Sequence, residues 1–235
     1  MPNQYPYHIA IILDGNRRYA KQKNLQSWQG HEFGAKKVQE LIKWSLELGI
    51  KQLTLYTFSI ENFTRTKKEV GHIMSLFRKY FSQMKKQKKK DMQEVKINFI
   101  GRLSLFPNDI QKMMQEIMKK TENNQKLILN FAIGYGGRTE IIDGIKKILQ
   151  EKESGKSERF KDEITEQKFM NYLYLNSEPN IIIRPGGEKR VSNFLIYQGA
   201  YSEWFFLDKL WPEITKQDFI NVLEEFKSRE RRFGK

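Results

Sequence analysis

The sequence predicts a single α/β domain with a central, mainly parallel six-stranded sheet flanked by helices. Short apolar runs that suit buried strands alternate with longer amphipathic stretches that suit helices, which is the pattern of a parallel sheet. The chain of 235 residues is long enough for one sizeable core, and nothing in its composition calls for a second. We therefore treat residues 1–235 as one domain.

The composition limits the classes of function. The net charge of +14, from 42 basic and 28 acidic side chains, indicates anionic partners such as phosphorylated metabolites, nucleic acid or acidic lipid. The absence of cysteine excludes disulfides and thiolate metal sites, and three dispersed histidines are too few for a zinc site. No uncharged run is long enough to span a membrane, and no signal peptide is apparent. We expect a cytoplasmic protein.

The first predicted strand is the apolar run from Ile9 to Leu13, which suits a strand buried on both faces. It places Asp14 at the carboxyl end of an inner strand, where open α/β sheets bind ligands. Gly15 allows a tight turn, and residues 16–18 (Asn-Arg-Arg) open the next helix with two guanidinium groups that attract phosphates. An ordinary strand-to-helix turn is the alternative interpretation of this segment.

The other elements follow in alternation. Further strands are predicted at 53–58, 95–100, 127–133, 181–183 and 204–207, and helices at 30–48, 67–90, 107–120, 141–149, near 169–175 and from 216 onward. The helix from residue 67 carries a long apolar stripe. Core packing explains most of that stripe, but such a helix could also line an apolar tunnel.

Polar side chains follow three of these strands. Ser59, Glu61, Asn62 and Arg65 come after the second strand, and Arg184 ends the fifth, with Arg190 and Ser192 close behind. Carboxyl ends of parallel strands meet at one edge, so five arginines would gather beside Asp14. Their planar guanidinium groups could bind two diphosphates side by side, and Asp14 could hold Mg²⁺ against one of them.

Seven segments resemble the cis-prenyltransferase family, that of undecaprenyl diphosphate synthase and dehydrodolichyl diphosphate synthase. They are residues 8–21 (HIAIILDGNRRYAK), 30–34, 53–65 (LTLYTFSIENFTR), 135–138, 181–203, 210–212 and 229–234. The resemblance implies a homodimer with an elongated apolar tunnel. It also implies Mg²⁺-dependent addition of isopentenyl diphosphate to an allylic diphosphate primer, farnesyl or geranylgeranyl diphosphate, to give a long-chain cis-polyprenyl diphosphate.

The resemblance also implies a role for each matched side chain. Asp14 matches the catalytic acid that engages Mg²⁺, and Glu203 matches a second metal-binding acid. The allylic diphosphate site is matched by Gly15, Asn16, Arg17, Arg18, Tyr19 and His31; the segment near the reacting carbons by Ser59, Ile60, Glu61, Asn62 and Phe63; and the isopentenyl diphosphate site by Arg65, Arg184, Arg190, Val191 and Ser192. Asn62 holds the position commonly assigned as proton acceptor. Because a neutral amide is a poor base, we expect it to orient water or a diphosphate oxygen.

Three further matches concern the tunnel and the subunit contact. Ala35, Thr57 and Leu127 are expected to set product length, with Leu127 at the tunnel floor. Arg232 and Gly234 match a tail that reaches the partner's active site. The chain departs from the family at two positions: Ser27 replaces a further diphosphate-binding arginine, and Lys189 replaces a histidine beside Arg190.

Three alternative functions are weaker. A haloacid-dehalogenase-like phosphatase needs an acid two residues after its nucleophile, where this chain has Asn16. A nucleic-acid-binding protein would not need arginines after strands beside an acid, so we expect no nucleic acid partner. A catalytically silent partner subunit would not need Asp14 or residues 184–192. The basic run 85–90 suits a solvated helix end, or alternatively a patch that holds the protein at the cytosolic face of a membrane.

Overall fold

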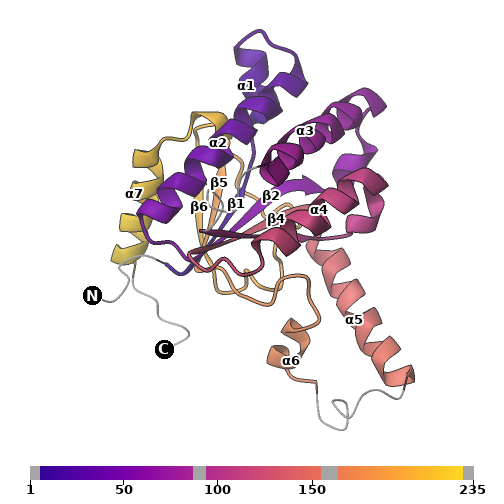
Figure 1. The fold of residues 1–235 in the computed structure, drawn as a ribbon. Coiled ribbons are helices and arrows are strands. Elements are labelled where there is room, and N and C mark those ends of the chain that lie inside the picture. The colour runs from indigo at the N-terminus through magenta and orange to yellow at the C-terminus, as the bar shows by residue number, and fades with distance from the viewer. Residues whose placement is uncertain (1–5, 87–93, 155–163, 230–235) are drawn as a thin grey trace.

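Figure 1 shows the computed structural model, which describes residues 6–86, 94–154 and 164–229. One six-stranded sheet forms its centre, in the order β3-β4-β2-β1-β5-β6. All five strand pairings are parallel, which confirms the predicted fold class. The strands are β1 (His8–Ile12), β2 (Gln52–Ser59), β3 (Val95–Ile100), β4 (Leu127–Tyr135), β5 (Ile181–Pro185) and β6 (Glu203–Leu207).

Seven α-helices connect and cover these strands in the described part of the chain: α1 (Asn16–Gln22), α2 (Ser27–Glu47), α3 (Lys67–Lys86), α4 (Asn108–Thr121), α5 (Gly137–Glu153), α6 (Glu166–Met170) and α7 (Lys216–Ser228). α2 begins three residues earlier than predicted because Gln26 and Gln29 form a capping box. α6 likewise begins early, since the Thr165 hydroxyl accepts a hydrogen bond from the Lys168 backbone N–H at 3.2 Å.

The two faces of the sheet are covered differently. Ile9 and Ile11 point to the larger core cluster, together with apolar side chains of α2, α3, α4 and α7. Ala10 and Ile12 point to a smaller cluster that includes Phe194 and Leu195, which belong to the chain between β5 and β6. Alternate residues of β1 therefore enter two separate cores, as expected for a strand buried on both faces.

The strand order creates a crevice at the carboxyl edge. The chain leaves β1 toward β2 on one side and later returns on the other side, so that β5 pairs with β1. Such a reversal of direction is a topological switch point, and ligands of open α/β sheets bind just outside it. Asp14 follows β1 and Arg184 lies in β5, so this crevice brings the two residues together.

Parts of two predictions lie outside the described residues. These are the tail residues Arg232 and Gly234, and positions 87–90 of the basic run. The first two residues of that run, Lys85 and Lys86, are described and end α3. Among the described helices, none combines the length and the apolar character needed to cross a membrane.

Candidate active site

The turn after β1 is fixed by close packing. Gly15 has φ +103°, and a Cβ at this position would lie 2.9 Å from the Leu210 side chain, so only glycine fits without strain. The Trp211 backbone N–H donates to the Asp14 carbonyl at 2.9 Å. The segment before α7 therefore holds the Asp14 turn against the sheet.

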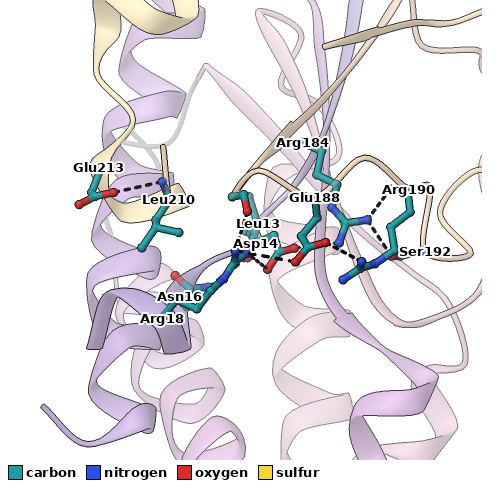
Figure 2. Close-up of polar contacts among 11 residues, drawn as sticks. Leu13, Asp14, Asn16, Arg18, Arg184, Glu188, Arg190, Ser192, Leu210 and Glu213 are labelled. Atoms are coloured by element: carbon teal, nitrogen blue, oxygen red, sulfur yellow. Dashed lines mark hydrogen bonds and ion pairs between the residues drawn. The ribbon is translucent and has the colours of Figure 1, made fainter. Parts of the chain in front are cut away.

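Asp14 lies between two guanidinium groups (Figure 2). Its Oδ2 accepts from Arg184 Nη2 at 2.8 Å, and its Oδ1 lies 3.3 Å from Arg18 Nη2. Arg184 is almost fully buried, whereas the Asp14 side chain is 28% exposed and remains accessible. Gly186 leaves room for Arg18, which donates from Nη1 to the Gly186 carbonyl at 2.6 Å. The sequence prediction that Asp14 lies among arginines at this edge agrees with these contacts.

The loop after β5 is organised by Arg184. Its Nη1 donates to the Ser192 hydroxyl at 2.7 Å and to the Arg190 carbonyl. Arg190 itself is 61% exposed and pairs with Glu188 at 2.6 Å, as Figure 2 shows. Figure 2 shows the Arg190 and Ser192 side chains on the Arg184 side of Asp14, with Arg190 held by Glu188.

A second cationic group surrounds Glu69, in the first turn of α3. Glu69 Oε1 lies 2.8 Å from Arg65 Nη1, 3.7 Å from Arg17 Nε and 3.8 Å from His31 Nε2. Burial and the nearby Arg65 charge lower the pKa of His31 to about 4, so its imidazole is neutral at pH 7. The sequence prediction grouped Arg65 with Arg184, and the structure adds that Arg65 shares the Glu69 carboxylate with Arg17 and His31. Glu69 was not predicted.

Asn16 is held by two glycines of α2. A Cβ on Gly30 would lie 1.9 Å from the Asn16 carbonyl oxygen, and one on Gly34 would lie 2.2 Å from Asn16 Oδ1. The Asn16 Nδ2 donates to the Leu13 carbonyl at 3.1 Å. This contact orients the side chain, because its oxygen then has to point away from Leu13.

Three buried polar atoms of this region have no hydrogen-bond partner among the described residues: Asn16 Oδ1, His31 Nε2 and Arg184 Nε. The fourth such atom, Gln198 Oε1, lies elsewhere. Buried polar atoms in folded proteins are nearly always paired, so unpaired ones that gather at one edge indicate a ligand site.

The turn after β2, the 3₁₀ helix Ile60–Thr64, carries the segment matched to the reacting carbons. Asn62 Oδ1 accepts from the Ser59 backbone N–H at 3.0 Å, which fixes the side chain so that its amide N–H groups point away from Ser59. Burial raises the pKa of Glu61, but hydrogen bonds from its own backbone, Ser59 and Asn193 outweigh burial and lower it overall. Glu61 is therefore an ionised carboxylate at neutral pH.

Two connected hollows meet at these residues. The tunnel cavity, of about 620 Å³, runs from Asp14, Asn16, Arg184 and Ser192 between α2 and α3, and its apolar wall includes Ala35, Val38, Ile42, Thr57, Phe58, Ile73, Phe77, Phe81, Met84, Phe131 and Ile133. The basic cleft, of about 710 Å³, is lined by residues 13–18, Lys21, residues 24–27, His31 and Arg65. His31 and Arg65 line both hollows, which meet at these two side chains. The apolar stripe of α3 forms part of the wall of the tunnel cavity.

Several predicted residues lie away from these hollows. Tyr19 packs on Phe33 with ring centroids 5.2 Å apart, and Phe63 packs on Phe58 at 4.8 Å. Ile60 and Val191 line neither hollow. Leu127, the expected tunnel floor, begins β4 and is fully buried in the core outside the cavity lining.

Glu203 does not meet Asp14 within one chain. It begins β6, where it pairs with Ile181 at the start of β5, whereas Asp14 follows the end of β1. The two acids are separated by about five residues of strand, ~16 Å along the sheet. Glu203 instead pairs with Arg229 at 2.8 Å.

Comparisons with known proteins agree with this geometry. The family model described as "Putative undecaprenyl diphosphate synthase" matches residues 12–234. The chain is 46% identical to a tritrans,polycis-undecaprenyl-diphosphate synthase (geranylgeranyl-diphosphate specific) from Pyrococcus horikoshii, over 98% of this chain and 87% of that protein. It is 44% identical to an isoprenyl transferase from Thermotoga maritima, over 97% of each.

A solved structure shares the fold closely. Lavandulyl diphosphate synthase from Lavandula x intermedia, in complex with dimethylallyl diphosphate, superposes with a TM-score of 0.89 at 30% identity, over 99% of both chains. The match over nearly the whole length covers the Asp14 turn, the β5 loop and the tunnel helices together. The chain belongs to the cis-prenyltransferase family and condenses isopentenyl diphosphate onto allylic diphosphate primers.

Proposed function

We propose that this enzyme elongates farnesyl or geranylgeranyl diphosphate with isopentenyl diphosphate to a long-chain cis-polyprenyl diphosphate. The observation that carries this proposal is the position of Asp14, between two sets of cationic side chains and at the mouth of an apolar cavity. One set suits each diphosphate, and the cavity suits the growing hydrocarbon.

The two cationic sets divide the substrates between them. Arg17, His31 and Arg65 border the basic cleft and are assigned to the diphosphate of the allylic primer. Lys21 lines the same cleft as Ser27 and supplies a cation in place of the arginine that relatives carry there. Arg184, Arg190 and Ser192 are assigned to isopentenyl diphosphate, whose double bond then lies next to the primer.

The reaction forms one carbon–carbon bond between the double bond of isopentenyl diphosphate and the allylic carbon of the primer. The bond from that carbon to its diphosphate breaks, and isopentenyl diphosphate loses one proton. Arg17, Arg65 and neutral His31 stabilise the charge on the departing diphosphate, since fixed donors in a partly dry site act strongly on developing charge. Asn62 orients water or a diphosphate oxygen through its N–H groups, while its oxygen holds the Ser59 backbone N–H.

The donor set fits Mg²⁺ held jointly with a diphosphate. Among the residues that the structure describes, no cluster of three or more His, Cys, Asp or Glu side chains could enclose a metal. Mg²⁺ typically takes one or two carboxylates together with substrate phosphates and water, and Asp14 offers one accessible carboxylate at the cleft. When bound there, Mg²⁺ would neutralise charge on the leaving diphosphate.

The test is incubation of the purified enzyme with labelled isopentenyl diphosphate, Mg²⁺ and each allylic primer in turn, with products sized by chromatography. We expect long-chain products that depend on primer and are lost with a chelator. Ala35→Leu should shorten the products by narrowing the tunnel cavity. Leu127→Ala should lengthen them if Leu127 closes the tunnel floor, and an unchanged length would remove that assignment. Failure of every primer to accept isopentenyl units would refute the proposal.

We also propose a homodimer that is joined through α5. Ile142, Ile145 and Leu149 form one face of this helix and are 49%, 42% and 52% exposed. α5 extends away from the sheet in Figure 1, and a second copy could cover the same stripe on both subunits. Light scattering should give a dimer mass for the wild type and a monomer mass for Ile145→Glu. Asn221→Glu, at an exposed position of α7, is the control and should keep the dimer mass. A monomeric wild type would contradict this assembly.

Peripheral membrane association is the last proposal here. Met84 lines the tunnel cavity, and Lys85 and Lys86 follow it directly at the end of α3. The Met84 end of the tunnel cavity thus lies beside Lys85 and Lys86, where anionic lipid could receive the product. Sedimentation with vesicles of anionic lipid should fall when these lysines are neutralised, and unchanged binding would refute the role.

A further inference from the structure

Asn193 connects the active site to the start of α5 through three hydrogen bonds. Its Nδ2 donates to Glu61 Oε1 at 3.1 Å. Its Oδ1 accepts from the Arg138 backbone N–H at 2.9 Å, and its carbonyl accepts from the Gly137 backbone N–H at 2.7 Å. One side chain therefore joins the turn after β2, the loop after β5 and the first turn of α5.

The glycine run before α5 makes this connection possible. A Cβ on Gly136 would lie 2.8 Å from Asn193 Nδ2, and one on Gly137 would lie 3.2 Å from the Asn193 carbonyl oxygen. The two glycines therefore let the backbone approach Asn193 closely. Glycine at positions 136 and 137 is therefore explained by the approach of Asn193.

The loop around Asn193 is held in an unusual conformation. Ser192, Asn193 and Leu195 have φ of +47°, +61° and +44°, and such left-handed values are costly for residues other than glycine and, to a lesser degree, asparagine. The Tyr56 hydroxyl donates to the Ser192 carbonyl at 3.4 Å, and the Tyr56 ring stacks on Phe194 with centroids 4.6 Å apart. Surrounding contacts thus maintain the strain, which is typical of functional sites.

We infer that Asn193 is a positioning residue, which holds the exposed Glu61 carboxylate at the wall of the tunnel cavity by anchoring it to α5. Glu61 lies on a short 3₁₀ turn, where Ser59 bonds its carboxylate from the adjoining strand end and Asn193 bonds it from the loop after β5, far along the chain. Both residues line the tunnel cavity beside Asp14 and Arg184. The ionised Glu61 faces the region where the proposed reaction develops positive charge on the primer's allylic carbon. The inference rests on the proposed function.

Two substitutions at Asn193 separate this role from a structural one. Both glycine and aspartate tolerate the left-handed backbone. Asn193→Gly removes both side-chain bonds. Asn193→Asp keeps an acceptor for the Arg138 N–H but turns a carboxylate toward Glu61, which repels it. Positioning of Glu61 therefore predicts that Asn193→Asp loses more kcat than Asn193→Gly, whereas a purely structural role predicts the reverse, because aspartate retains the bond to α5.

The experiment measures kcat, the KM for each substrate and the thermal midpoint. It compares the two variants with Asn221→Asp, a control at an exposed position of α7. We expect kcat to fall about tenfold in Asn193→Gly and about a hundredfold in Asn193→Asp, with the primer KM within about twofold. We expect Asn193→Asp to melt at or above Asn193→Gly, and the control to match the wild type. A smaller kcat loss in Asn193→Asp than in Asn193→Gly, or wild-type kcat in both, would overturn the inference.

Glu61→Gln distinguishes failure of the inference from failure of the proposed function. If Glu61→Gln retains wild-type kcat, Glu61 has no role near the reacting carbons. The assignment of Glu61 within the proposed function then fails. If Glu61→Gln is impaired while Asn193→Gly is not, the assignment of Glu61 survives and only the inference about Asn193 fails. In the double variant Glu61→Gln/Asn193→Gly, we expect little loss beyond that of Glu61→Gln alone, because the two residues act through one contact.

Discussion

Buried polar groups are treated differently in the middle of the sheet and at its carboxyl edge. Across the middle, a polar ladder joins four strands: His8 Nε2 lies 2.8 Å from the Thr54 hydroxyl, Asn130 Nδ2 donates to that hydroxyl at 3.0 Å, and Asn98 Nδ2 donates to Asn130 Oδ1 at 2.9 Å. At the carboxyl edge, three buried atoms have no hydrogen-bond partner among the described residues: Asn16 Oδ1, His31 Nε2 and Arg184 Nε.

This contrast separates the polar residues that stabilise the fold from those that bind the ligand. A paired network in a low-dielectric interior stabilises and specifies the packing of the strands, whereas unpaired groups cost stability until a ligand satisfies them. Substitutions in the polar ladder should therefore reduce stability and spare catalysis. Substitutions of the unpaired groups at the carboxyl edge should reduce catalysis and spare stability.

The largest effect is expected at Asp14. Asp14→Ala should lower kcat about a thousandfold, ~4 kcal/mol in barrier, because it removes the accessible carboxylate of the cleft and almost no core volume. Asp14→Asn should be similarly inactive while it keeps an acceptor for buried Arg184, so its thermal midpoint should stay near that of the wild type. The measurement is incorporation of labelled isopentenyl diphosphate beside thermal unfolding. Turnover within about tenfold of the wild type would contradict a central role for Asp14.

The opposite result is expected in the polar ladder. Thr54→Val keeps the shape of the side chain but leaves His8 and Asn130 without their shared partner. We expect the free energy of unfolding to fall by about 2–3 kcal/mol, with kcat/KM unchanged at temperatures where the variant is folded. Urea unfolding and a steady-state assay check the two quantities. A loss of kcat/KM that exceeds the loss of stability would break the proposed separation between the two regions.

The carboxyl edge was predictable because strand ends are visible in the sequence. The run Ile9–Leu13 ends at Asp14, and the run at 181–183 ends at Arg184, so a parallel sheet must bring both residues to one edge. The strand order, which makes β1 and β5 neighbours, was not visible, because it depends on which side of the sheet each crossover packs. The direct ion pair between Asp14 and Arg184 was therefore beyond sequence analysis.

Two expected placements depend on where a strand begins. Glu203 and Leu127 each begin a strand, so both lie at the amino edge, away from Asp14. The sequence contains this signal, since each apolar run starts at or just after the residue in question. The position of Glu69 in the site, in contrast, was not visible in the sequence. An acid four residues after Arg65 indicates a helix ion pair, and only the fold shows that Arg17 and His31 meet it as well.

A smaller effect is expected from crowding Asn16. The Cβ of Gly34→Ala would lie 2.2 Å from Asn16 Oδ1, so Asn16 or α2 must move. We expect kcat/KM to fall about tenfold and the free energy of unfolding to fall by about 1–2 kcal/mol. Gly71→Ala on α3 is the matched control, because its Cβ meets no atom within 4 Å, and it should be neutral or slightly stabilising. Equal effects of the two substitutions would show that the approach of α2 to Asn16 is unimportant.

The pH dependence of stability compares two histidines, one in each region. Burial lowers the pKa of His8 to about 4, and burial together with Arg65 lowers that of His31 to about 4. The unfolded chain binds these protons near the ordinary pKa of about 6.5, so acid favours unfolding. Stability should fall as pH drops from about 6.5 toward 4, by up to about 1.4 kcal/mol per pH unit for each histidine, and neither should contribute above that range.

Inorganic diphosphate separates the two contributions. An anion in the basic cleft favours the charged imidazole of His31, whose Nε2 is unpaired, but does not reach His8, which is paired with Thr54 inside the sheet. Urea unfolding near pH 5.5 should therefore show a larger gain in stability from added diphosphate in His8→Gln, which retains His31, than in His31→Gln. Because the difference between the two variants cancels the binding that the other cations contribute, equal gains would mean that His31 does not face the diphosphate.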